Sequence, residues 1–209
     1  MRKITLLLVL VLAVPVFALP RQVADDMRSN VVFLMKENQI VCSGVKVSDT
    51  SVLTAAHCPS DAKVSEDMTT LLDSSALKED KDRDLRLLRV SGLQKKWASL
   101  ANEWWVGMDI YLVGYILGQP RVISYGLLET VIPSFTYGNW KDAQVFCTGA
   151  NVHPGSSGGG WFDSEGRLLA IQSFGYYDTN TLGDRGVIER VWSCGIGLDS
   201  VKAFLGGAR

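Results

Sequence analysis

Residues 155–160 comprise four glycines and two serines directly after Pro154. Glycine and proline are poor formers of helices and central strands, so this segment predicts a turn. Glycines allow main-chain N–H groups to converge on one point, which is how an oxyanion hole is built, and a serine in such a turn is a candidate nucleophile. The competing interpretation is a flexible Gly/Ser loop without chemistry.

A serine hydroxyl is a weak nucleophile and needs a neighbouring base, for which histidine is suited because its ordinary pKa lies near neutrality. The chain contains two histidines, His57 and His153. His57 follows the apolar residues 51–56, whereas His153 lies in the same loop as the serines. Asp84 opens the apolar strand predicted at 84–90, which could carry its carboxylate into the interior.

Three motifs in this order resemble the trypsin-like serine protease family. The segment T-A-A-H-C around His57 is similar to the family segment that holds the general base. The segment D-L-R-L-L from Asp84 resembles the strand that carries the family's aspartate, and G-S-S-G-G matches the pattern G-x-S-G-G at Ser157. The order His, Asp, Ser is that of the family, and the resemblance covers essentially the whole chain from residue 19 onward.

The resemblance implies a catalytic set of His57, Asp84 and Ser157, with the N–H groups of Gly155 and Ser157 as the oxyanion hole. In such a set a buried carboxylate fixes the histidine tautomer and stabilises the imidazolium. Each assignment has a competitor. These are a packed core role for His57, His153 as a rival base, Asp80 and Asp82 in place of Asp84, and Ser156 in place of Ser157. The motifs favour the first set.

Two positions depart from the family pattern. Arg86 stands where the family usually has alanine, on the same side of the strand as Asp84. It is expected either to pair with Asp84 or to turn outward at an exposed edge. Ser156 replaces the aspartate that pairs with a newly cut N-terminus in digestive proteases, so we expect no activation of that kind. The chain resembles instead the shorter bacterial and HtrA-like branch, without a PDZ module.

The resemblance also implies a set of substrate-binding residues. Asn151 falls at the base of the primary pocket, and the absence of an acidic residue there argues against a preference for Lys or Arg. The segment Ser173-Phe174-Gly175 resembles the wall that binds substrate backbone as an added strand. His153 is a further pocket candidate, and Gly186 would leave the pocket open.

The four cysteines are disulfide candidates if the chain is exported, and four cysteines allow three pairings. The resemblance implies a Cys42–Cys58 bridge, and the family's strand order puts Cys147 and Cys194 on neighbouring strands as a second hypothetical pair. A zinc site is disfavoured because the chain has no C-x-x-C pair and only two histidines. No metal and no cofactor are expected.

Short strands, regular glycine turns and one terminal amphipathic helix indicate an all-β barrel or sandwich protein. The resemblance implies two antiparallel six-stranded β-barrels, the first over about 28–98 and the second over about 104–195, with a short C-terminal helix at about 198–206. The first barrel would carry His57 and Asp84, and the second Ser157 and the pocket. The site would lie in the cleft between them.

The first 18 residues have the features of a signal peptide. Arg2 and Lys3 precede the apolar run 4–14, and Val16-Phe17-Ala18 offers a cleavage site after Ala18. The alternative is an uncleaved anchor, although the run is shorter than a spanning helix needs. We expect residues 1–18 to be removed, the mature domain 19–209 to be secreted or periplasmic, and no stable membrane anchor to remain.

The 209 residues carry a formal net charge of −1, which gives no electrostatic argument for nucleic-acid binding. The sequence therefore predicts a secreted serine endopeptidase that acts on protein or peptide substrates through an acyl-enzyme. The alternative is a catalytically inactive pseudoprotease that serves as a binding module, for which Arg86 beside Asp84 is the one argument. A purely structural secreted β protein is a third, weaker alternative.

Overall fold

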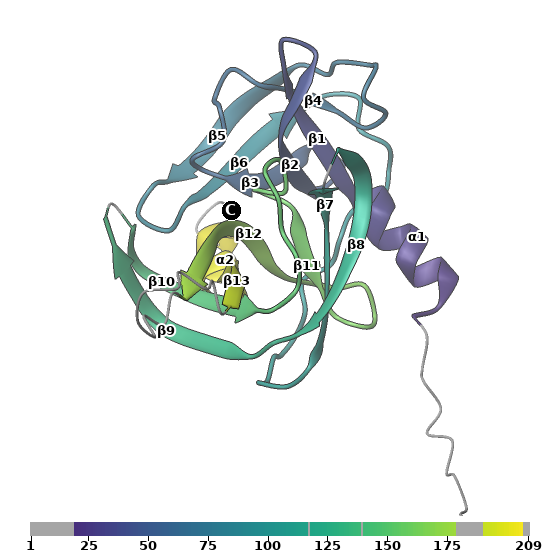
Figure 1. Cartoon of the computed structure of the whole chain (residues 1–209). Coiled ribbons are helices and arrows are strands. Elements are labelled where there is room, and N and C mark those ends of the chain that lie inside the picture. Colours follow the sequence, from purple (N-terminus) through teal and green to yellow (C-terminus); the bar gives the residue numbers. More distant parts are fainter. Residues whose placement is uncertain (1–18, 117, 139, 179–189, 207–209) are drawn as a thin grey trace, which may run out of the picture.

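The computed structural model describes residues 19–116, 118–138, 140–178 and 190–206. In these ranges the chain forms thirteen strands and two helices. Figure 1 shows the strands in two sheets, with the earlier part of the chain (purple to blue) above the later part (teal to yellow). The all-β fold with two barrel-like sheets is as predicted from the sequence.

The first sheet has six antiparallel strands in the order β4-β1-β2-β3-β6-β5. Their bounds are β1 Val31–Lys36, β2 Gln39–Ser48, β3 Ser51–Ala55, β4 Lys63–Ser65, β5 Ser74–Asp80 and β6 Leu85–Val90. The strands form because short apolar runs rich in valine and leucine alternate with turn residues. Its central strands β2 and β3 lie next to the second sheet in Figure 1.

The second sheet has seven strands in the order β8-β7-β11-β12-β13-β10-β9. Their bounds are β7 Asp109–Ile116, β8 Gln119–Leu127, β9 Thr130–Tyr137, β10 Trp140–Thr148, β11 Gly160–Phe162, β12 Leu168–Asp178 and β13 Arg190–Gly197. Six strands were expected. Seven are present, and the shortest of them, β11, has three residues, too few to show an alternating pattern in the sequence.

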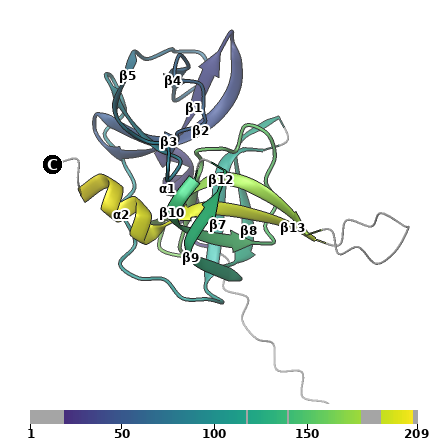
Figure 2. The same cartoon turned by 90° about the vertical axis from the view of Figure 1, so that its left-hand side faces the viewer.

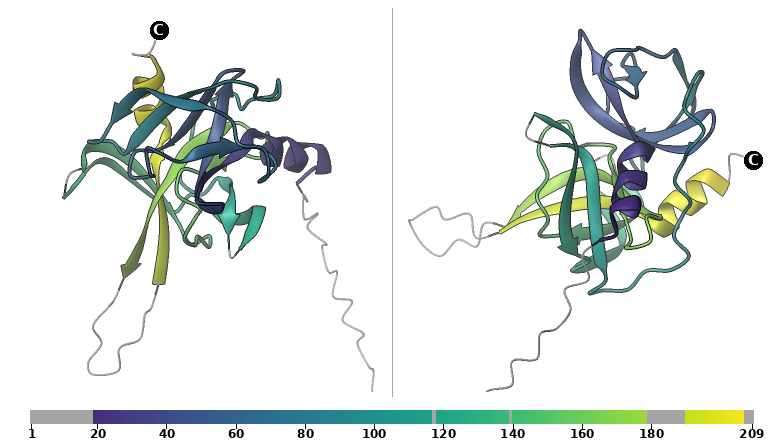
Figure 3. Two further views of the ribbon diagram at one scale, coloured as in Figure 1. Left: turned by 90° about the horizontal axis from the view of Figure 1, so that it is seen from above. Right: turned by 90° about the vertical axis from the view of Figure 1, so that its right-hand side faces the viewer.

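Two helices flank the sheets, as Figures 2 and 3 show from other directions. The predicted C-terminal helix is α2, Leu198–Gly206, and Lys78 of β5 donates a hydrogen bond to its Phe204 carbonyl at 2.6 Å. The other helix, α1 at Arg21–Asn30, was not predicted. It buries only Met27 and Asn30, and its apolar side is a short stripe of Val23 and Met27 in an otherwise polar sequence, which is easily overlooked.

The two sheets are joined by a shared core cluster, and each also has a cluster of its own. A single cluster of buried apolar side chains joins Leu53 and Leu85 of the first sheet to Val113, Phe162 and Ile171 of the second. Close packing of this kind resists relative movement, because interiors are as dense as organic crystals. Residues contributed by the two sheets are therefore held at fixed distances. Within the described ranges, no helix is both long and apolar enough to cross a membrane.

Candidate active site

His57 and Asp84 meet at the adjoining ends of two paired strands. β3 ends at Ala55 and β6 begins at Leu85, and these two residues are partners in the antiparallel ladder. The residues that follow β3, which include His57, therefore lie beside Asp84, the residue that precedes β6. Asp84 accepts the main-chain N–H of His57 at 2.9 Å through Oδ1, and its Oδ2 lies 2.8 Å from Nδ1 of the imidazole.

The two side chains differ in exposure: 1% for Asp84 and 40% for His57. An ionised carboxylate only accepts hydrogen bonds, so Nδ1 of a neutral ring carries the proton and Nε2 is left as an acceptor. The main chain of Asp84 adopts φ 54°, a left-handed conformation that aspartate tolerates better than most residues. This conformation turns the chain into β6 while the carboxylate faces the histidine.

The Gly-rich segment consists of two successive turns. Ser156 N–H donates to the His153 carbonyl at 3.0 Å, with Pro154 and Gly155 between them, and Gly155 has φ 93°. Gly159 N–H then donates to the Ser156 carbonyl at 2.8 Å, and Gly158 has φ 80°. A positive φ at the third residue is the pattern of a type II turn, which requires glycine there. Ser157 is thus at the tip of the second turn.

The second turn packs directly on the first sheet. Ser43 N–H of β2 donates to the Ser157 carbonyl at 2.7 Å. A side-chain carbon at Gly158 would lie 2.2 Å from both the Ser43 carbonyl oxygen and the Thr54 Oγ1. Only glycine therefore permits this approach, which fixes Ser157 relative to β2 and β3.

The N–H groups of Gly155 and Ser157 form no hydrogen bond with any other group in the described part of the chain. The carbonyl of Gly155 is held from the other side, because Ser43 Oγ donates to it at 2.9 Å and accepts the Tyr115 N–H at 3.0 Å. The Tyr115 ring covers Gly155 closely enough that an added Cβ would lie 2.5 Å from it. Two free donors on a fastened loop are what an oxyanion hole requires.

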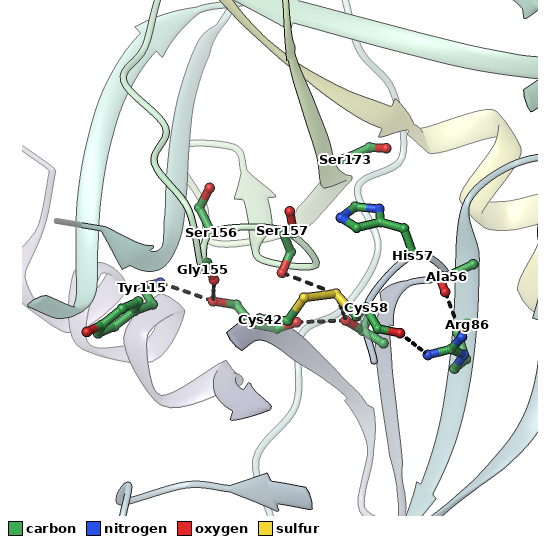
Figure 4. The surroundings of a disulfide bond; sticks show 12 residues. Cys42, Ala56, His57, Cys58, Arg86, Tyr115, Gly155, Ser156, Ser157 and Ser173 are labelled. Carbon is green, nitrogen blue, oxygen red and sulfur yellow. Dashed lines mark hydrogen bonds between the residues drawn. A yellow bond between two sulfur atoms is a disulfide. The ribbon is translucent and has the colours of Figure 1, made fainter. Parts of the chain in front are cut away.

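Figure 4 shows Ser157 and the imidazole of His57 facing each other above the Cys42–Cys58 disulfide. The Ser157 carbonyl oxygen lies 3.8 Å from Cys58 Sγ, so the disulfide packs against the serine turn. The Ser157 hydroxyl makes no hydrogen bond to another described residue. Catalytic hydrogen bonds are often long in resting sites and tighten only with substrate.

Two of the competing residues, Ser156 and Asp80, are engaged elsewhere. Ser156 is buried and its hydroxyl donates to the His153 carbonyl at 2.7 Å. Asp80 binds the Arg83 side chain at 2.8 Å. Arg86 follows neither expected course: its guanidinium donates to the carbonyls of Ala56 and Cys58, each at 2.6 Å, instead of pairing with Asp84 or turning outward.

Both expected disulfides are present. Cys42–Cys58 joins β2 to the loop after β3, and Cys147–Cys194 links directly opposed residues of β10 and β13. Among the described residues, one group of potential metal ligands is compact: Cys42, His57 and Cys58. Its two sulfur atoms form a disulfide and therefore offer no thiolate.

The predicted pocket residues lie on the loop after β10 and on β12. Asn151 is exposed, and its N–H donates to Ser124 Oγ at 3.1 Å. The half-buried Phe174 stacks on Phe135 with ring centres 5.4 Å apart, whereas Gly175 is exposed and pairs with Ser193. Gly186 lies outside the described residues, as does the predicted signal peptide 1–18.

Sequence reasoning missed two hydroxyls at the site. Ser173 was expected to offer only its main chain, but its buried hydroxyl donates to Asp84 Oδ2. Ser43 carried no expected role, although it contacts both the serine turn and Tyr115. The available signals were that Ser43 directly follows Cys42 and that Ser173 opens the segment Ser173-Phe174-Gly175.

The model of the trypsin-like peptidase domain family matches residues 42–171, which include every residue of the serine turn. Among curated proteins, Protease Do-like 1, chloroplastic, of Arabidopsis thaliana is 27% identical over 121 residues. This match covers 54% of the chain and 27% of the relative, so the chain spans about a quarter of that protein's length.

Solved structures resemble the whole fold. The inactive form of the Rv3671c protease superposes with a TM-score of 0.72 at 18% identity, covering 91% of this chain and 94% of that chain. The active form, from M. tuberculosis, gives 0.72 at 19% identity, with 90% and 84% covered. The HtrA-type protease AlgW with a tripeptide gives 0.71 at 16% identity, with 88% and 62% covered. At these identities the likeness concerns the fold alone.

Proposed function

The chain belongs to the trypsin-like peptidase family, and we propose that it is a serine endopeptidase with Ser157 as nucleophile, His57 as general base and Asp84 as the residue that orients the base. The observation that carries this proposal is the contact of the buried Asp84 carboxylate with both the main-chain N–H and the ring Nδ1 of His57. The ring is thereby fixed with Nε2 available beside Ser157.

The proposed reaction proceeds through an acyl-enzyme. Ser157 Oγ attacks the carbonyl carbon of the scissile peptide while His57 Nε2 accepts the hydroxyl proton. The N–H groups of Gly155 and Ser157 stabilise the oxyanion that forms. His57 then donates its proton to the leaving amine, and a water molecule, deprotonated by the same nitrogen, releases the acyl group. Each oxyanion donor typically contributes about 3 kcal/mol to transition-state stabilisation.

Substrate would bind along β12 as an added strand. β11 pairs with β12 only through residues 168–171, so from Ser173 onward β12 has β13 as its single neighbour among the described strands. This free edge supports main-chain recognition of an extended peptide. Phe174, packed against Phe135 and Trp140, would line the path of the substrate side chains.

The two disulfides favour an oxidising compartment, since such bonds persist outside the reducing cytosol. We therefore infer export after removal of residues 1–18, to the periplasm or the exterior. The substrates are proteins or peptides, as in the family, with a primary specificity other than Lys or Arg. The match to an Arabidopsis Do-like protease and the fold of HtrA-type AlgW support an HtrA-like ancestry.

The test is labelling of the purified, oxidised mature chain by a fluorophosphonate probe, together with hydrolysis of an unfolded protein substrate. We expect labelling of the wild type and its loss in Ser157→Ala and His57→Ala. Ser156→Ala is the matched control, because this neighbouring hydroxyl is committed to the His153 carbonyl, and it should still be labelled. An unlabelled but folded wild type would contradict the proposal and favour the pseudoprotease. The sequence argument for the pseudoprotease was Arg86 beside Asp84, but Arg86 donates its hydrogen bonds to Glu79, Cys58 and Ala56.

A further inference from the structure

Arg86 is a buried cation on β6, opposite Thr54 of β3. Its side chain is 6% exposed and uses all three sides of the guanidinium. Nη2 donates to the Ala56 carbonyl and Nη1 to the Cys58 carbonyl, both at 2.6 Å, and Nε donates to Glu79 Oε2 at 3.0 Å. The two carbonyls belong to the residues on either side of His57.

These carbonyls have left the β3 ladder and have no strand partner. Within the described ranges, Arg86 is the hydrogen-bond donor to both of them. The planar fork of arginine reaches two acceptors at a fixed separation, which a single lysine ammonium cannot do in the same way. The guanidinium thus holds the peptide group that precedes His57 and the one that follows Cys58.

The buried charge is balanced by Glu79, whose side chain is 26% exposed. Burial raises the pKa of Glu79, but the hydrogen bond and charge of Arg86, aided by Lys81, outweigh burial and leave that pKa below its ordinary value. Glu79 is therefore ionised at neutral pH, and a buried cation with a paired anion meets the usual condition for such groups.

Other groups secure different parts of the same loop. Asp84 holds the ring and the N–H of His57, and the disulfide holds Cys58 against Cys42. Neither contacts the side of the loop on which the Ala56 carbonyl lies. The Asp84 carbonyl accepts the Ala56 N–H at 3.1 Å, and Arg86 holds the Ala56 and Cys58 carbonyls, so the carbonyl side of the loop around His57 is fixed by Arg86. Figure 4 shows Arg86 on the opposite side of the loop from Ser157.

We propose that Arg86 is a positioning residue for His57, which through the carbonyls of Ala56 and Cys58 holds the imidazole at its working position relative to Ser157. This inference rests on the proposed function, in which His57 is the base. Loss of the fork should lower kcat and leave KM nearly unchanged, because the β12 edge proposed to bind substrate belongs to the other sheet. A misplacement of about 1 Å in a catalytic group can cost about 100-fold in rate.

The experiment compares Arg86→Ala and Arg86→Lys with Arg83→Ala in the oxidised mature protein. Arg83 is the matched control because it is a nearby cation that pairs with Asp80 and contacts neither carbonyl. We expect kcat to fall about 10- to 100-fold in Arg86→Ala, with KM within about twofold, while Arg83→Ala keeps the wild-type constants. Millimolar guanidinium should restore part of kcat in Arg86→Ala, and methylammonium should not.

A second readout does not depend on activity. The proton shared between His57 Nδ1 and Asp84 is expected as a low-field NMR resonance in the wild type, broadened or lost in folded Arg86→Ala and retained in Arg83→Ala. If the wild type proves inactive, the proposed function fails while this resonance still decides the role of Arg86. An unchanged resonance and unchanged kcat in a folded Arg86→Ala would overturn the inference, as would equal rescue by methylammonium. If Arg86→Ala does not fold, Arg86→Lys is judged by the same two readouts.

Discussion

The hydroxyl of Ser173 donates a hydrogen bond to the same Asp84 oxygen that faces Nδ1 of His57. The other oxygen of Asp84 accepts the His57 N–H. The carboxylate thus accepts three hydrogen bonds, although its side chain is only 1% exposed. Ser173 comes from β12 of the second sheet, so the aspartate is oriented by both halves of the molecule.

Removal of this hydroxyl should weaken the orientation of His57. We expect Ser173→Ala to lower kcat by about tenfold, since a hydrogen bond to a charged group is worth about 1.5–3 kcal/mol. Steady-state kinetics on a peptide substrate measure the effect. Ser200→Ala, which removes a buried hydroxyl on α2 that serves Gln144, is the control and should keep kcat. Equal effects of both changes would contradict a specific role for Ser173.

The Ser43 hydroxyl should matter for the oxyanion loop. Ser43→Ala removes the donor to the Gly155 carbonyl and the acceptor of the Tyr115 N–H. The loop that carries the oxyanion donors would then be less well fixed. We expect kcat to fall by about 10-fold with little change in KM. This loss is smaller than the roughly 10²–10³-fold loss of kcat on complete removal of one oxyanion donor, because both donors remain. Ser43→Thr keeps the hydroxyl and should recover most of the rate. If Ser43→Ala and Ser43→Thr have the same kcat, the hydroxyl is not the cause.

Gly158 and Gly107 provide a matched test of packing. Both have a positive φ, so alanine at either position carries a conformational penalty of about 1–2 kcal/mol. At Gly107 nothing lies within 4 Å of an added Cβ, whereas at Gly158 the Ser43 carbonyl oxygen and Thr54 Oγ1 lie at 2.2 Å. We expect Gly158→Ala to reduce the free energy of unfolding by about 1–3 kcal/mol more than Gly107→Ala does. Urea denaturation of both variants measures the difference, and similar losses would show that the turn can move away from the first sheet.

Glu79 should make stability depend on acid pH. Its pKa is lowered in the folded protein, where Arg86 outweighs burial, so the carboxylate stabilises the fold above the ordinary glutamate value of about 4.3. This contribution is lost as pH falls from that value through the lowered folded pKa. Urea denaturation between about pH 3 and 7 should show a shallower acid decline for Glu79→Gln than for the wild type. Parallel declines in the two proteins would rule out this linkage.

The strands were largely predictable, because short apolar runs between turn residues mark them in the sequence. His57, Asp84 and Ser157 were found through motifs, and the structure brings them together. Contacts between distant segments were not predictable in the same way. The course of Arg86 depends on where the carbonyls of Ala56 and Cys58 point, and a side-chain pattern says nothing of carbonyl directions.

The helix α1 and the strand β11 were missed for opposite reasons. α1 is polar except for Val23 and Met27, which lie four residues apart and pack on the core, so its apolar period spans only about one turn. β11 is apolar but has only three residues, and its strand conformation is imposed by pairing with β7 and β12. Tertiary context decided both elements.

The hydrogen bonds from Ser43 to the serine turn join residues more than a hundred positions apart, since Ser43 and Gly155 are separated by 112 residues. A chain still being synthesised, or kept extended for export, can contain the first sheet and lack the turn that its β2 strand must hold. The site therefore comes into existence only after the serine turn has been made and has packed against β2. On the proposed function, the order of assembly itself keeps an incomplete chain from cleaving other proteins during synthesis.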